Sequence, residues 1–112
     1  MSDWAELTAE VNKFRDDRDW RQFHNEKDLA LSIVLEAAEL LESFQWRASD
    51  EAVAAERDHI SEELADVLIY CLMLADNLGL DVGEIVRAKL AANGEKYPVE
   101  KAAGRKAKYT EL

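Results

Sequence analysis

The chain has 112 residues, of which 24 are acidic and 14 are basic, and it carries a formal net charge of -10 at pH 7. This length fits a single domain, 1–112, and a hydrophobic content of 48% with one proline is typical of a helix-rich globular protein rather than a disordered or fibrous one. The negative charge argues against broad attraction to nucleic acid or to anionic membranes, although an acidic protein can bind phosphates through a cation.

The amino-terminal residues and the single cysteine predict a cytoplasmic location. Residues 1–4 have neither the basic nor the apolar region of a leader peptide, and no apolar run approaches the roughly 20 residues that a membrane span needs. Cys71 has no partner for an internal disulfide and lies within an apolar run. We therefore expect a buried thiol in a reducing compartment.

Hydrophobic periodicity predicts an all-α fold. The expected helices cover residues 3–18, 26–45, 59–78 and 81–94. Polar residues stand where side-chain caps are expected at the starts of the first, second and fourth of these helices: Asp3, Asn25 and Asp81. Gly79 follows the third helix as a carboxy-terminal glycine would. The pattern therefore predicts a four-helix bundle.

Three segments depart from this helical pattern. Residues 19–27 form an aromatic and polar connection before the second helix. Residues 47–58 are polar and rich in alanine, and they fit either a loop or the exposed first turns of the third helix. The basic tail, 99–112, shows little periodicity, so we expect it to cross the surface or a neighbouring subunit.

Two polar stripes run along helices that are otherwise mostly apolar. On the second helix the stripe consists, at spacings of four, three and four, of Ser32, Glu36, Glu39 and Ser43. The third helix repeats this spacing with His59, Glu63, Asp66 and Tyr70. One acidic pair alone is more often part of a solvated face, but two pairs in matching apolar helices favour a site.

The acidic stripes predict a metal site. If the two helices pack antiparallel, the carboxylates that meet in one cleft are Glu36, Glu39, Glu63 and Asp66. Four like charges repel one another unless they are protonated or bridged by cations. Carboxylate oxygens favour magnesium or manganese over zinc, and magnesium usually completes its shell with phosphate oxygens. A di-iron bundle would need Glu-x-x-His on two helices, and the sequence offers only Glu56 with His59.

Aromatic and basic residues form a second set of candidates. Those in a position to stack on a nucleobase are Trp20, Trp46 and Tyr70. The phenylalanines are more typical of a core. Near the end of the fourth helix, the residues that could offer an amide to a sugar and ammonium groups to phosphates are Lys89, Asn93 and Lys96. Helical lysines are usually solvated, so this second cluster depends on the carboxylate site for its interpretation.

In ordered combination, several motifs resemble the MazG-like family of all-α nucleoside triphosphate pyrophosphohydrolases, most closely its dCTP pyrophosphatase branch. They extend over nearly the whole chain and comprise Phe14 to His24, Glu36-Ala37-Ala38-Glu39, Phe44-Gln45-Trp46, Glu62 to Tyr70, Asn93 with Lys96-Tyr97-Pro98, and Lys108 to Leu112. The resemblance implies a homodimer or a homotetramer. The segment 47–58 is shorter than in the animal enzymes, and base selectivity stays open at this point.

The resemblance also implies roles for individual residues. The implied magnesium ligands are Glu36, Glu39, Glu63 and Asp66, in agreement with the spacing argument. The residues implied to hold the base and sugar are Trp20, His24, Trp46, Tyr70 and Asn93. Those implied to lie toward the phosphates are Lys89, Lys96 and Tyr97.

The sequence thus predicts an enzyme that uses Mg²⁺, with Mn²⁺ as a substitute, to hydrolyse a nucleoside triphosphate such as dCTP or a modified dCTP. Water would attack the α-phosphorus, oriented by Glu36 or Glu39, and pyrophosphate would leave. The implied role is the removal of unwanted nucleotides. Alternatives are the same fold acting on dUTP or another non-standard triphosphate, a non-catalytic acidic module that binds metal or a partner, and carboxylates that only pair with the basic tail during assembly.

Overall fold

The computed structural model describes residues 3–112, and every regular element in that range is helical. The elements are α1 (Trp4–Asp17), η1 (Arg21–Phe23), α2 (Glu26–Glu42), α3 (Ser49–Asn77), α4 (Val82–Lys96), α5 (Val99–Ala102) and η2 (Tyr109–Glu111). The predicted all-α class is therefore confirmed. The chain divides into two compact units, the first extending to Leu80 and the second covering Asp81–Leu112, and each is described by itself.

The predicted helix caps are present. The Asp3 carboxylate accepts a hydrogen bond from the Glu6 backbone N–H at 2.8 Å, and the Asn25 side chain accepts one from the Asp28 N–H at 2.8 Å. These bonds satisfy backbone donors that have no partner in the first turn of a helix. α1 ends one residue before the predicted end, and α2 ends at Glu42 rather than at residue 45.

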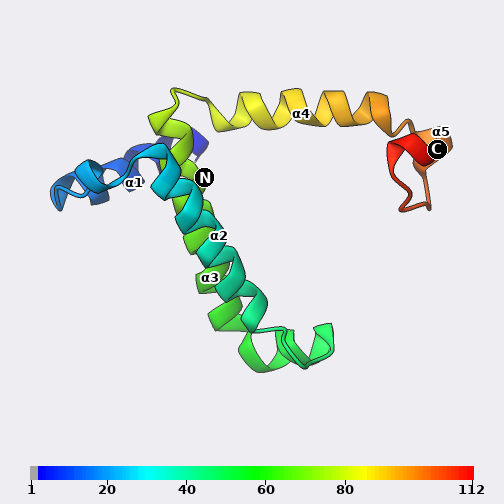
Figure 1. The fold of residues 1–112 in the computed structure, drawn as a ribbon, viewed down its shortest axis with the longest axis horizontal. Helices are drawn as coiled ribbons and strands as arrows, with labels where there is room; N and C mark the ends of the chain where they lie inside the picture. The colour runs from blue at the N-terminus through cyan, green and yellow to red at the C-terminus, as the bar shows by residue number, and fades with distance from the viewer. Residues whose placement is uncertain (1–2) are drawn as a thin grey trace. The chain divides into compact units, whose positions relative to one another are not determined.

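In the first unit, α2 and α3 form a hairpin and lie side by side along their length, as Figure 1 shows. The chain turns between them at residues 43–48, where Trp46 has a positive φ of 63°. α1 also packs against α3. This antiparallel pairing of α2 with α3 is the arrangement that the two polar stripes require.

The structure decides between the two alternatives for residues 47–58. α3 starts at Ser49, ten residues before the predicted start, so most of the segment is helix. The backbone of Glu56 leaves helical geometry, with φ of -133° and ψ of 31°, and the helix is kinked there. The Arg47 guanidinium donates to the Glu56 carboxylate at 2.8 Å, which ties the kink to the turn after α2.

The core of the first unit is small. Its buried hydrophobic residues lie on α2 and α3 and are Leu29, Ala52, Leu72, Met73 and Ala75. Large apolar side chains on the same two helices are exposed, among them Val34, Leu35, Leu41, Leu64 and Leu68. Exposed apolar faces of this kind are typical of surfaces that pack against another chain.

The second unit begins with the predicted cap. Gly79 has a φ of +67°, which suits glycine and ends α3, and the Asp81 side chain then accepts from the Glu84 N–H at 2.9 Å. α4 continues to Lys96, two residues beyond the predicted end. The expected number of four helices is wrong for the described residues, because Pro98 starts a short fifth helix, α5, within the tail. A four-helix bundle remains a prediction.

In residues 3–112, no helix combines the length and the apolar character that crossing a bilayer requires.

Candidate metal and nucleotide site

Three of the four predicted carboxylates meet between α2 and α3. One carboxylate oxygen from each of Glu36, Glu39 and Glu63 lies within 4.8 Å of the other two. Glu36 and Glu39 stand three residues apart on one face of α2, and the antiparallel hairpin brings Glu63 of α3 opposite them. The structure therefore brings together three of the four carboxylates that the spacing indicated, and their role as metal ligands stays a prediction.

Two oxygens of the cluster are buried without a partner among the described residues, Glu36 Oε2 and Glu63 Oε2. A buried carboxylate oxygen that lacks a hydrogen bond costs folding free energy. Burial, followed by the neighbouring Glu39 and Glu63 and the charge of Asp66, raises the pKa of Glu36 to about 7. The cluster thus holds more negative charge than its surroundings neutralise.

The cationic side chains of the first unit do not compensate this charge. The ion pairs found in residues 3–112 bring no lysine or arginine to the three clustered carboxylates. One histidine is near: His59 Nε2 lies 3.8 Å from Glu63 Oε1, one turn away on α3. A divalent cation bound by hard oxygen ligands would remove both the repulsion and the unpaired oxygens.

Asp66 lies one turn beyond Glu63 and connects the cluster to a cavity. It is outside the group of three oxygens, but its charge acts on Glu36 and also on Tyr70. Burial raises the pKa of the Tyr70 hydroxyl, and the charges of Glu36, Asp66 and Glu39 raise it further. Asp66 and Tyr70 therefore share the electrostatic environment of the cluster.

The cavity lies between α1 and α3 and has a volume of about 480 Å³. Its lining consists of Leu7, Glu10, Val11, Phe14, Trp20, Asp66, Ile69, Tyr70 and Met73. An apolar pocket of this size with few polar groups is typical of small-molecule sites. Trp20 forms one wall and meets the Phe14 ring edge to face, with centroids 5.6 Å apart. An aromatic pocket thus adjoins a carboxylate cluster.

Comparisons with known proteins place this arrangement in a family. The MazG-like family profile matches residues 31–112. Over 117 aligned residues the chain is 39% identical to dCTP pyrophosphatase 1 of Mus musculus, and the alignment covers 100% of this chain and 67% of that protein. The protein belongs to the MazG-like family.

Other relatives support the same membership. A pyrophosphatase from Archaeoglobus fulgidus, known from its crystal structure, superposes with a TM-score of 0.79 at 45% identity and covers 84% of this chain and 91% of its own. A dATP/dGTP diphosphohydrolase of Cyanophage S-2L is 56% identical over 43 residues, which are 38% of this chain and 41% of that protein. The prediction of an enzyme of the pyrophosphohydrolase class is confirmed by these relationships.

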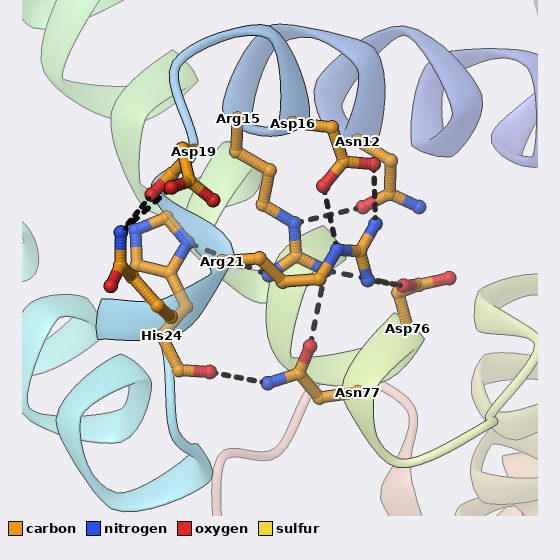
Figure 2. A network of polar contacts seen from close by, with 9 residues as sticks. Asn12, Arg15, Asp16, Asp19, Arg21, His24, Asp76 and Asn77 are labelled. Carbon is orange, nitrogen blue, oxygen red and sulfur yellow. Dashed lines mark hydrogen bonds and ion pairs between the residues drawn. The ribbon is translucent and has the colours of Figure 1, made fainter.

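A second charged network in the MazG-like chain holds α1, η1 and α3 together (Figure 2). Arg15 of α1 is 0% exposed. Its Nη2 donates to Asp76 Oδ2 and to Asn77 Oδ1, each at 3.1 Å, and its Nε donates to Asn12 at 3.0 Å. Burial lowers the pKa of Arg15 first, and the charge of Arg21 lowers it further, while Asp76 opposes both effects.

Arg21 of η1 completes this network. Its guanidinium donates to both oxygens of Asp16, at 2.7 and 3.0 Å, and to Asp76 Oδ2 at 3.1 Å. The Asp16 hydrogen bond is the largest contribution that raises the pKa of Arg21. The network thereby links α1 and η1 to the end of α3, and Trp20 lies in the connection between α1 and η1.

His24, for which the resemblance implies a role at the base and sugar, lies against this network. Its Nδ1 is 3.5 Å from Arg15 Nη1, and its backbone carbonyl accepts from Asn77 Nδ2 at 2.6 Å. Burial lowers the pKa of His24, and the charges of Arg15 and Arg21 lower it further. The structure thus gives His24 contacts with the network, and its role toward a substrate stays a prediction.

The other predicted site residues are Trp46 in the first unit and four residues of the second unit. Trp46 is 98% exposed in the turn after α2. Lys89, Asn93, Lys96 and Tyr97 belong to the second unit. There the Tyr97 and Tyr109 rings meet edge to face, and the Lys96 ammonium lies 4.8 Å from the Tyr109 ring centroid. The roles of these residues stay predictions.

The sequence pattern did not reveal the wall that α1 forms in the pocket. The helical spacing of Leu7, Val11 and Phe14 predicts a helix, and nothing in that spacing indicates a pocket. The sequence pattern also did not reveal the partners of Arg15, because Asp76 and Asn77 lie more than sixty residues away in the chain. The available signal for this network was the mixture of acidic and basic residues at 14–20, at the end of a helix.

Proposed function

We propose that this MazG-like protein hydrolyses a nucleoside triphosphate, with dCTP or a modified dCTP as the preferred substrate, to the monophosphate and pyrophosphate. One observation carries the proposal: a cluster of three carboxylates with two buried, unpartnered oxygens adjoins an aromatic pocket through Asp66 and Tyr70. The named activities of the dCTP pyrophosphatases and of the phage dATP/dGTP diphosphohydrolase support it.

The residues fit a divalent cation. Glu36, Glu39 and Glu63 would hold it together with Asp66, and all of their donor atoms are the hard oxygens that Mg²⁺ prefers, with Mn²⁺ as a substitute. The unpartnered oxygens of Glu36 and Glu63 are the observation that this fit explains. When bound, such an ion supplies charge neutralisation for the triphosphate and activation of water.

The protein's own side chains would orient the reactants. Trp20, Phe14 and Tyr70 offer aromatic surfaces to a base within the 480 Å³ pocket. Asp66, at the boundary between pocket and cluster, sets the direction in which the triphosphate extends from the base. A carboxylate of α2, Glu36 or Glu39, would accept a hydrogen bond from the water that attacks the α-phosphorus.

The test is pyrophosphate release from a panel of deoxynucleoside and ribonucleoside triphosphates. Metal-stripped protein is assayed with and without Mg²⁺, in the wild type and in Glu63→Gln, with the exposed neighbour variant Glu62→Gln as the control. Magnesium-dependent release that is lost only in Glu63→Gln supports the proposal. Unchanged release in Glu63→Gln would overturn the site assignment, and the absence of release from every triphosphate would favour a binding or assembly role.

We also propose that the protein acts as a homodimer or a homotetramer. The exposed apolar side chains of α2 and α3, such as Val34 and Leu35 at 65% exposure each, support this assembly. Sedimentation of the full chain at several concentrations tests it. A monomer at all concentrations would contradict it.

A further inference from the structure

The pocket between α1 and α3 has few polar groups, and most of its lining is aromatic or aliphatic. The polar groups of its lining are the Glu10 and Asp66 carboxylates, the Tyr70 hydroxyl and the indole N–H of Trp20. An ionised carboxylate can only accept hydrogen bonds, whereas the Tyr70 hydroxyl can donate or accept and the Trp20 indole N–H only donates. The two carboxylates therefore favour a ligand edge that donates N–H groups.

Two of these groups, Asp66 and Tyr70, are electrostatically coupled to the carboxylate cluster of Glu36, Glu39 and Glu63. The charge of Asp66 contributes to the raised pKa of Glu36, and the charges of Glu36, Asp66 and Glu39 contribute to the raised pKa of Tyr70. Glu10 lies on a different helix, α1, and has no part in that cluster. It is thus the carboxylate of the pocket that remains for contact with the base.

Glu10 also has no competing partner among residues 3–112. No side-chain hydrogen bond or ion pair in that range involves its carboxylate. The nearest ammonium along α1, that of Lys13, is paired with Asp17 at 2.7 Å. The Arg18 guanidinium, one helical turn beyond Phe14, stacks at 3.8 Å from that ring and donates to the Phe14 carbonyl.

We propose that Glu10 determines base selectivity by accepting a hydrogen bond from the exocyclic amino group of the base. This inference rests on the proposed function and names its substrate class: triphosphates whose base carries an amino group, such as cytosine and adenine, rather than the carbonyl counterparts uracil and hypoxanthine. A carbonyl oxygen set against the Glu10 carboxylate leaves two acceptors facing each other. Neither of them can then be satisfied by the other.

The expected discrimination is moderate because Glu10 is solvent-exposed at the pocket wall. A buried hydrogen-bonding site can reject the mismatched analogue by several orders of magnitude, and solvent reduces this for an exposed group. We expect a preference on the order of 10- to 100-fold for dCTP over dUTP and for dATP over dITP, since an unpaired polar group costs about 1–3 kcal/mol.

The experiment measures kcat/KM with Mg²⁺ for the two pairs, dCTP with dUTP and dATP with dITP, on the full chain. Glu10→Gln should collapse both ratios toward one, mostly by improving dUTP and dITP, because a carboxamide both donates and accepts. Glu10→Leu should collapse them by impairing dCTP and dATP. The matched control is Glu6→Gln, the same change one turn earlier on α1 and outside the pocket lining.

A second measurement separates this inference from the proposed function. Calorimetric binding of dCMP and dUMP to the same variants needs no turnover. If no triphosphate is hydrolysed but dCMP binds more tightly than dUMP and Glu10→Gln removes the difference, the proposed function fails and the inference stands. Unchanged substrate ratios in Glu10→Gln, with the wild-type melting temperature retained, would overturn the inference, as would a wild type that binds or hydrolyses both members of each pair equally.

Discussion

The first unit contains two charged clusters on the same helix, and they differ in how their charges are compensated. Toward the end of α3, Asp76 and Asn77 accept from the buried Arg15, and Asp76 also pairs with Arg21 (Figure 2). Earlier on α3, Glu63 meets Glu36 and Glu39 without lysine or arginine among the ion pairs described. Within residues 3–112, the charges of the first cluster are paired with one another, whereas no lysine or arginine pairs with the second.

The difference separates a structural role from a binding role. A buried charge remains tolerable when hydrogen bonds and an opposite charge compensate its desolvation, as they do for Arg15. The ion pairs of residues 3–112 provide no such compensation for the carboxylate cluster. The raised pKa of Glu36 and the unpartnered oxygens therefore indicate that this cluster lowers the free energy of unfolding. Binding of a positively charged ligand, as in the proposed function, would offset this cost.

The largest expected effect comes from removing one charge of the uncompensated cluster. Glu63→Gln should lower magnesium-dependent pyrophosphate release by about 100- to 1,000-fold, the range seen when one electrostatic contact of a reaction centre is lost. Steady-state kinetics measure it. Its melting temperature without metal should not fall, since the change relieves repulsion; a clear loss of stability would assign Glu63 a structural role instead.

A substitution in the compensated cluster of Arg15, Arg21 and Asp76 should mainly lower stability. Arg15→Met should lower the free energy of unfolding by about 2–4 kcal/mol, because Asp76 and Asn77 lose a buried partner while Asp76 stays partly solvated. Urea denaturation measures it. Lys13→Met, which breaks the exposed Lys13–Asp17 pair of the same helix, should change stability by only about 0–1 kcal/mol. Equal effects of the two substitutions would contradict the structural role of the network.

Magnesium itself should distinguish the clusters through thermal stability. At 100 times its dissociation constant, Mg²⁺ should stabilise the wild type by about 2.7 kcal/mol, which is the value for a ligand that binds only the folded state. The stabilisation should persist in Lys13→Met and disappear in Glu63→Gln. A melting temperature that magnesium leaves unchanged in the wild type would mean that the carboxylates hold no such ion.

The smallest expected effect is the pH dependence of the metal-free protein. The folded state raises the pKa of Glu36 from its ordinary 4.5 to about 7, so the folded state binds the proton more tightly than the unfolded state. This contribution to stability is therefore fully present below pH 4.5 and is lost as pH rises through about 7.

Its size should be about 1 kcal/mol, because solvent reaches part of the Glu36 side chain. Thermal melts of the wild type and of Glu36→Gln between pH 4.5 and 8, each without metal, isolate it. The variant should lose less stability than the wild type over this range, and parallel curves would show that Glu36 does not titrate there.

Local chemistry was sufficient for much of the fold. Asp3, Asn25 and Asp81 cap their helices as predicted, because capping depends on residues only three positions apart. Helix ends were less accurate. The ten-residue error at the start of α3 arose because an alanine-rich segment has helical propensity but no clear hydrophobic stripe, and its contact between Arg47 and Glu56 spans a turn.

The candidate site divides in the same way. Glu36 with Glu39, and Glu63 with Asp66, were recognised as pairs because a helix places residues three apart on one face. Their convergence depends on antiparallel packing of the two helices, which the sequence pattern allows but does not establish. Glu10 could not be recognised from the sequence, since one glutamate on an amphipathic helix has no distinguishing pattern until a pocket forms beside it.

The sequence by itself determined the helical class, the caps and the two acidic pairs, because each depends on residues within one or two turns of the chain. Tertiary structure alone decided which carboxylates are left without a partner, which residues line the pocket, and that Asp76 compensates Arg15 from 61 positions away. The reason is physical: burial and charge compensation are properties of the space between helices, and that space exists only once the helices have packed.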